Sequence, residues 1–140
     1  MKKNSKQRKQ TILIVEDDEQ VLDIVERILS SDGYKTATAA RASDAVRIAA
    51  RIRPDIVILD LNLPDYNGIQ VLREIKGIDP AIQVIILTGY GSQDTARSAM
   101  EIGAFDFLTK PVKFNELCAV VQEACISEAP VVNREDHHAQ

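Results

Sequence analysis

Short apolar runs recur along the chain, and each stops abruptly at charged or turn-forming residues. Three of them, TILIV, IVIL and QVIIL, are almost continuously apolar and rich in β-branched residues. This composition is typical of strands buried on both faces of a parallel sheet. Two weaker runs of the same kind complete the set. We expect five strands, at 11–15, 34–39, 56–59, 83–87 and 104–108.

Between the strands, apolar residues recur every three or four positions, as on the buried face of an amphipathic helix. Gly33, Pro54, Pro80 and Gly103 end the first four of these stripes. The expected buried positions of the five helices are Val21, Leu22, Ile24, Val25, Ile28 and Leu29; Ala42, Ala45, Val46, Ala49 and Ile52; Ile69, Leu72 and Ile75, after Asn67-Gly68; Ala96, Ala99 and Met100, within 92–102; and Leu117, Val120, Val121 and Ala124, within 115–126.

Five strand–helix units in strict alternation predict an α/β fold with a parallel sheet covered by helices on both faces. Right-handed crossovers then give an open, doubly wound sheet. A chain of 140 residues suits one such domain. Ligands of doubly wound sheets bind outside the carboxyl ends of the strands, so the residues that follow each strand are the candidates for chemistry.

The charge is unevenly distributed along the chain. Five basic residues and no acidic ones lie in the first ten positions, whereas the whole chain has a net charge of −4. We expect 1–10 to be a basic flexible leader, 11–127 the folded domain and 128–140 a flexible polar tail. An acidic body argues against a domain that binds a phosphate backbone, although a nucleic-acid-binding arm at 1–10 is an alternative.

The chain lacks the sequence signatures of several other classes of protein. No apolar run approaches the roughly 20 residues that span a bilayer, and no secretory signal is recognisable. Cys118 and Cys125 match no zinc or disulfide pattern, and we interpret them as small apolar helix residues. A reducing cytoplasm is the expected compartment. His137 and His138 lie in the polar tail, far from the other motifs, and we assign them no chemistry.

Unusual polar residues follow four of the five expected strands, all at carboxyl ends. They are Glu16, Asp17 and Asp18; Asp60; Thr88 and Gly89; and Thr109, Lys110 and Pro111. Each has an ordinary interpretation: acids favour a helix N-terminus, Thr88 could simply end a strand, and Lys110 could be an exposed loop residue. Because carboxyl ends of parallel strands share one edge, we expect the four groups to converge.

Converging carboxylates repel one another unless a cation lies between them. Hard oxygen ligands suit Mg²⁺, which favours a phosphate as a further partner. A carboxylate beside Mg²⁺, such as Asp60, can act as a nucleophile on phosphorus. The Lys110 ammonium adds a second positive contact, and the Thr88 hydroxyl can donate to a phosphoryl oxygen.

These residues lie in four motifs, ILIVEDDE, DIVILDLNLPDYNG, VIILTGYGS and GAFDFLTKP. In this order the chain resembles a response-regulator receiver domain of two-component signal transduction over residues 11–127. The segment LTGYGSQDTARSAMEIGAFDFLTKP is most similar in sequence to the corresponding segment of receivers attached to enhancer-binding transcription activators. The resemblance implies a flavodoxin-like (βα)5 sheet with strand order 2-1-3-4-5.

The resemblance also implies a role for each site residue. Asp60 would be the phosphoacceptor, and Thr88 and Lys110 would receive the phosphoryl group. The expected Mg²⁺ ligands and switch residues are Asp17 and Asp60 directly, Asn62 through its backbone carbonyl, Glu16 mostly through water, and Thr88 with the aromatic Phe107. The Lys110–Pro111 bond is expected to be cis. Phe107 lacks the hydroxyl of a Tyr, and a plain core phenylalanine is the alternative. Whether Asp18 or Glu19 touches metal stays open.

The implied function is Mg²⁺-dependent transfer of a phosphoryl group from a phosphohistidine to Asp60. The donor would be a sensor histidine kinase or a histidine phosphotransfer protein. Transfer would switch the surface formed by helix 92–102, strand 104–108 and helix 115–126, where a downstream protein, an attached effector domain or a second copy would bind. The protein would catalyse its own phosphorylation, and could catalyse its dephosphorylation, without being a dedicated enzyme. The chain could be a single-domain regulator or part of a longer protein.

Three alternatives remain. A receiver-shaped interaction module would keep the fold and work without phosphorylation, but the four motif residues are all present. An aspartate-based phosphatase needs a second carboxylate after the nucleophile, where this chain has Asn62. A flavin-binding relative would have a hydroxyl- and glycine-rich phosphate loop after the first strand, where this chain has acids.

Overall fold

The computed structural model describes residues 10–63, 67–89 and 93–127. The expected tail at 128–140, and all of the expected leader except Gln10, lie outside these described residues. Strands and helices alternate along the described chain. The elements are β1 (Thr11–Val15), α2 (Glu19–Ser31), β2 (Lys35–Ala39), α3 (Ala42–Ile52), β3 (Ile56–Asp60), α4 (Gly68–Ile78), β4 (Gln83–Thr88), α5 (Gln93–Ile102), β5 (Asp106–Thr109) and α6 (Phe114–Ile126).

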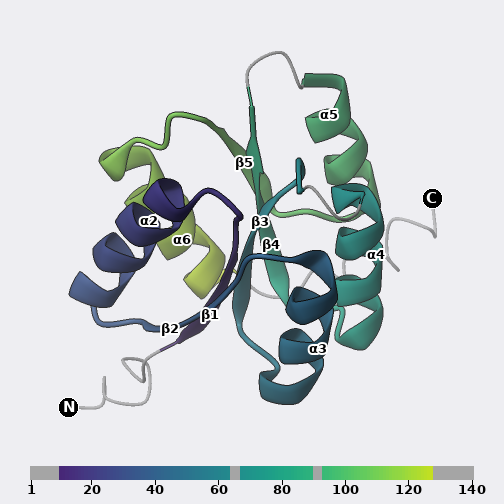
Figure 1. The fold of residues 1–140 in the computed structure, drawn as a ribbon, viewed down its shortest axis with the longest axis horizontal. Helices are drawn as coiled ribbons and strands as arrows, with labels where there is room; N and C mark the ends of the chain where they lie inside the picture. The colour runs from purple at the N-terminus through teal and green to yellow at the C-terminus, as the bar shows by residue number, and fades with distance from the viewer. Residues whose placement is uncertain (1–9, 64–66, 90–92, 128–140) are drawn as a thin grey trace.

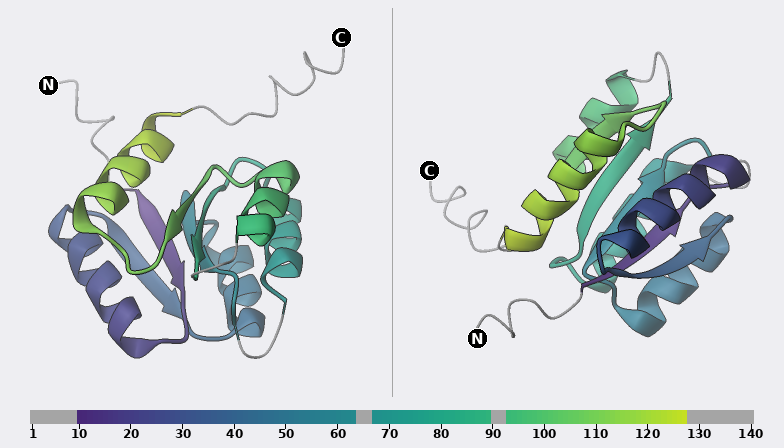
Figure 2. Two further views of the ribbon diagram at one scale, coloured as in Figure 1. Left: turned by 90° about the horizontal axis from the view of Figure 1, so that it is seen from above. Right: turned by 90° about the vertical axis from the view of Figure 1, so that its left-hand side faces the viewer.

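The strands form one parallel sheet in the order β2-β1-β3-β4-β5. Helices α2 and α6 cover one face, and α3, α4 and α5 cover the other (Figures 1 and 2). The predicted doubly wound α/β fold and its strand order are therefore confirmed.

The two faces of β1 show why continuous apolar runs were needed. Ile12 and Ile14 pack in a core with residues of α2 and α6, whereas Leu13 and Val15 pack in a second core with residues of α3 and α4. Successive side chains of a strand point to opposite faces, so a strand between two helix layers has no solvent-facing position. All four of these side chains are fully buried.

The last strand begins later than predicted. The sequence suggested 104–108, but β5 runs from Asp106 to Thr109. The N–H of Ala104 donates to the carbonyl of Ala99, 3.0 Å away, and so closes the end of α5 instead of joining the sheet. Apolar character alone does not separate a buried helix end from the strand that follows it.

Three residues expected on buried helix faces are exposed instead. Ile24, Ile52 and Met100 have exposed fractions of 51%, 40% and 37%. Ile24 and Met100 are each next to a fully buried position, Val25 and Ala99, so they point about 100° away from it around the helix. The predicted buried faces of the helices are confirmed at their centres, but they included residues at their edges that are exposed.

Both cysteines are free and half-buried, in agreement with the absence of a disulfide pattern. The Cys125 Sγ lies 3.7 Å from the Tyr34 hydroxyl, and the Cys118 Sγ lies 3.5 Å from Oδ2 of Asp32. Burial raises the pKa of both thiols. Among the described helices, none has the length and hydropathy that a bilayer span requires.

Candidate functional site

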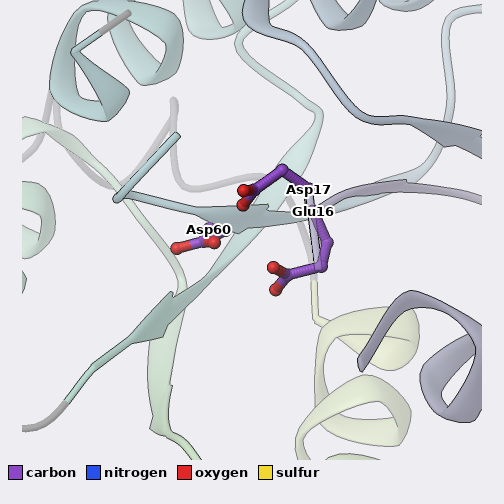
Figure 3. Close-up of side chains that lie close together, drawn as sticks. All are labelled: Glu16, Asp17 and Asp60. Atoms are coloured by element: carbon purple, nitrogen blue, oxygen red, sulfur yellow. The ribbon is translucent and has the colours of Figure 1, made fainter. Parts of the chain in front are cut away.

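Three carboxylates meet at the carboxyl edge of the sheet. Glu16 and Asp17 directly follow β1, and Asp60 is the last residue of the neighbouring strand β3. Each offers an oxygen that lies within 4.8 Å of the other two. Figure 3 shows the three side chains close together at this edge. The predicted convergence of these residues is therefore confirmed.

Two of the three carboxylates are out of contact with solvent. Glu16 and Asp60 have exposed fractions of 0% and 1%, whereas Asp17 is exposed. The backbone places Glu16 there: its N–H donates to the Ala39 carbonyl at 3.0 Å, so the pairing of β1 with β2 continues one residue beyond Val15. Two buried carboxylates this close together need a positive partner.

Lys110 supplies that positive partner. Its Nζ donates to Oε2 of Glu16 at 3.2 Å and to Oδ2 of Asp60 at 3.1 Å, and it lies 2.9 Å from Oε1 of Glu16. The Lys110 N–H donates to the Thr88 carbonyl at 2.9 Å, and the Lys110–Pro111 bond is cis, as predicted. The alternative of an exposed loop lysine is therefore wrong.

The burial of this cluster shifts two of its pKa values. Desolvation raises the pKa of Glu16 from 4.5 to about 7; the Asp18 N–H and Lys110 oppose this rise, and the charge of Asp60 adds to it. Burial alone would lower the pKa of Lys110, but its hydrogen bonds to Glu16 and Asp60 outweigh burial and raise that pKa. Lys110 is thus firmly protonated, while Glu16 can take up a proton near neutral pH.

The other oxygen of Asp60 has a backbone partner. The Asn62 N–H donates to Oδ1 of Asp60 at 2.9 Å, an Asx-type turn directly after β3. The resemblance gave Asn62 a role only through its carbonyl. An aspartate at the end of a strand, directly before turn-forming residues, was the sequence signal for this contact.

Asp18 has a structural role next to the site. It is the N-cap of α2, and its Oδ1 accepts from the N–H of Gln20 at 2.9 Å and of Val21 at 3.4 Å. Its carboxylate is outside the converging group of Glu16, Asp17 and Asp60. The ordinary interpretation of Asp18, as an acid at a helix N-terminus, is therefore confirmed.

The two expected switch residues lie on the neighbouring strands β4 and β5. Thr88 is buried, and its hydroxyl donates to the Leu108 carbonyl over a long 3.5 Å. Phe107 is 39% exposed, so the alternative of a plain core phenylalanine is wrong. Phe107 pairs with Ile86 in the sheet, two residues before Thr88 on β4.

The chemistry of the cluster fits a divalent cation. Three carboxylates converge here and one lysine pairs with two of them, which leaves excess negative charge when all are ionised. Glu16 Oε1 is buried and accepts no aligned hydrogen bond from the described residues; its ion-pair partner is the Lys110 ammonium, 2.9 Å away. Oxygen-only donors of this kind are those that Mg²⁺ prefers.

The family model for the response regulator receiver domain matches residues 12–122. The chain belongs to this family. The receiver is 36% identical to the transcriptional regulatory protein GlrR of Escherichia coli over 122 residues, which cover 87% of this chain and 28% of that one. It is also 36% identical to the sporulation initiation phosphotransferase F of Bacillus subtilis over 112 residues, covering 80% and 90% of the two chains.

Solved receiver structures agree with these relatives. The receiver domain of NtrX from Brucella abortus matches with a TM-score of 0.80 and 36% identity, covering 84% of this chain and 99% of that one. Receivers are phosphoacceptor domains of two-component signalling that bind Mg²⁺ at an acidic pocket, and this receiver has the corresponding acidic cluster. The chain spans little more than a quarter of the length of GlrR.

Proposed function

We propose that the side chain of Asp60 in this receiver accepts a phosphoryl group from a phosphohistidine. The observation that carries the proposal is the setting of Asp60. It is a buried carboxylate at the end of β3, with Lys110 on one oxygen, the Asn62 N–H on the other, and two further carboxylates beside it. A carboxylate held in this way has a fixed orientation, which favours attack along one line.

Asp17, Asp60 and the Asn62 carbonyl would hold Mg²⁺ directly, and Glu16 would act mostly through bound water. When bound, Mg²⁺ offsets negative charge on the phosphoryl oxygens and draws them toward the carboxylates. Glu16 is buried and paired with Lys110, whereas Asp17 is exposed at the same edge of the sheet, and this difference supports the direct role of Asp17.

In the transfer, an oxygen of Asp60 forms a bond to phosphorus while the bond from phosphorus to the histidine nitrogen breaks. The electron pair of that bond leaves with the imidazole, which then takes a proton from solvent. The product is an acyl phosphate on Asp60. The Lys110 ammonium, now 3.1 Å from Oδ2 of Asp60, contacts a phosphoryl oxygen of the product. The receiver thereby assists its own phosphorylation without being a dedicated enzyme.

Thr88 and Phe107 would carry the signal away from Asp60. The long hydrogen bond of the Thr88 hydroxyl leaves it free to turn toward a phosphoryl oxygen. Phe107 would then move into the space that Thr88 vacates. The surface formed by α5, β5 and α6 changes with it, and a downstream protein, an attached effector domain or a second copy of the chain would bind there.

The donor partner would be a sensor histidine kinase or a histidine phosphotransfer protein. Intact mass after incubation with Mg²⁺ and acetyl phosphate tests the proposal. Wild type and the control Asp44→Asn, an exposed carboxylate paired with Arg47, should gain one phosphoryl group, whereas Asp60→Asn and wild type in EDTA should gain none. If wild type gains no mass and binds no beryllofluoride, the protein is an interaction module that works without phosphorylation.

A further inference from the structure

Gly68, the first residue of α4, packs directly against the backbone of Leu61. A Cβ on Gly68 would lie 2.5 Å from the Leu61 Cα, 2.6 Å from its carbonyl oxygen and 2.8 Å from its carbonyl carbon. Real Cβ atoms essentially never approach closer than 3.0 Å, so any other residue here must move one of the two segments. Both residues are buried.

Leu61 connects the two residues of the site that follow β3. It lies between Asp60 and Asn62, and its N–H donates to the Leu87 carbonyl at 3.3 Å, which continues the sheet. The next N–H, that of Asn62, donates to Oδ1 of Asp60. A shift of Leu61 would therefore move both the Asn62 carbonyl and the Asp60 carboxylate.

The helix on the other side of the contact is firmly held. Asn67 caps α4, because its Oδ1 accepts from the Ile69 N–H at 2.8 Å. Val71, Leu72 and Ile75 of the same helix are fully buried in the core. A side chain added at Gly68 would thus displace the short Leu61–Asn62 segment more readily than the packed helix.

We infer that Gly68 is a positioning residue for the metal site: its lack of a side chain lets α4 fix the backbone that presents the Asn62 carbonyl and orients Asp60. This inference rests on the proposed function and deepens it. Gly68 touches neither metal nor phosphoryl group, and it acts through Leu61. Hydrogen-bonded partners that orient metal ligands contribute about 10- to 100-fold to metal affinity, and we expect a loss of similar size when Leu61 is displaced.

The test is a Mg²⁺ titration of Gly68→Ala by calorimetry, well below its melting temperature. The matched control is Gly77→Ala, because Gly77 lies in the same helix and a Cβ there meets nothing within 4 Å. Gly68→Ala should raise the Mg²⁺ dissociation constant about tenfold or more, and Gly77→Ala should leave it within about twofold. Equal affinities for wild type and Gly68→Ala would overturn the inference.

A second control separates positioning from loss of stability. Val121→Ala removes buried side-chain volume from α6 in the opposite core and lowers the melting temperature without touching this segment. It should bind Mg²⁺ as wild type does. In the metal-free proteins, the amide resonance of Asn62 should shift in Gly68→Ala and stay in place in Val121→Ala. If Val121→Ala loses as much Mg²⁺ affinity as Gly68→Ala, the effect is general destabilisation and the inference is wrong.

Asn67→Ala perturbs the same contact without adding volume, so it serves if Gly68→Ala does not fold. Loss of the cap loosens the first turn of α4 against Leu61, and the Mg²⁺ dissociation constant should rise about threefold or more. An unchanged constant in Asn67→Ala would overturn the inference in that case. The proposed function fails separately, if wild type itself neither binds Mg²⁺ nor gains a phosphoryl group.

Discussion

The ammonium of Lys110 lies 2.9 Å from Oε1 of Glu16, a carboxylate with no solvent-exposed surface. The two residues are 94 positions apart in the sequence and meet because β1 and β5 end at the same edge of the sheet. Lys110 also pairs with Asp60, so a single cation compensates two buried carboxylates. The stability of the metal-free receiver should therefore depend on Lys110 and on the protonation of Glu16.

Replacement of Lys110 by methionine should destabilise the metal-free receiver by about 3 kcal/mol at pH 8, because it leaves buried carboxylates without a counterion. The loss should be smaller at pH 5.5, where Glu16 is protonated in the folded state. Urea unfolding in EDTA at both pH values measures it. Lys113→Met, at the exposed N-cap of α6, is the control and should change stability little. A loss equal for both variants would contradict the role of the buried pairs.

Glu16 should make the metal-free receiver less stable as the pH rises. Its pKa is about 7 in the fold and 4.5 in an ordinary environment, so the folded state binds the proton more tightly. The stability that protonated Glu16 contributes is therefore complete below pH 4.5 and is lost as the pH rises through 7. Between pH 4.5 and pH 8, the free energy of unfolding of Glu16→Gln should rise relative to that of wild type by at most about 3 kcal/mol. Parallel urea curves at every pH would show that Glu16 does not titrate in this range.

The pattern of the sequence was sufficient to predict the parallel sheet and the convergence of the site, whereas the strand order came from the resemblance to receiver domains. Three strands buried on both faces leave unmistakable apolar runs, and the polar residues that follow them must meet at one edge. Glu16, Asp60 and Lys110 were found for this reason. Their unequal burial could not be predicted, because it depends on how the backbone after each strand continues.

Two features escaped the sequence for physical reasons. The contact of Gly68 with Leu61 is a backbone approach through space, and glycine also occurs near helix ends and in turns where no second segment comes close. The outward position of Phe107 is equally hidden, because an aromatic residue in a strand is usually packed in the core. Periodicity indicates which face a residue occupies and does not indicate how far the neighbouring elements cover it.

Mg²⁺ should stabilise the receiver through Asp17. At a Mg²⁺ concentration ten times its dissociation constant, the gain for wild type is about 1.4 kcal/mol, and it should be largely lost in Asp17→Asn. Asp18→Asn is the control, because asparagine also caps a helix and Asp18 lies outside the carboxylate cluster. Thermal unfolding with and without Mg²⁺ measures both variants. An equal loss in the two variants would mean that the stabilisation by Mg²⁺ depends on the general negative charge of the site and not on ligation by Asp17.

Phe107→Trp should report the conformational switch, since the chain has no other tryptophan. Residue 107 is 39% exposed in the fold, so movement into the space beside Thr88 should shift the tryptophan emission to shorter wavelength when Mg²⁺ and beryllofluoride are added. Adding Thr88→Ala should abolish the shift, because alanine has no hydroxyl to draw toward the phosphoryl analogue. Ile24→Trp, at a position 51% exposed in α2 and outside the surface formed by α5, β5 and α6, is the control and should not shift. A shift that persists with Thr88→Ala would show that residue 107 moves independently of Thr88.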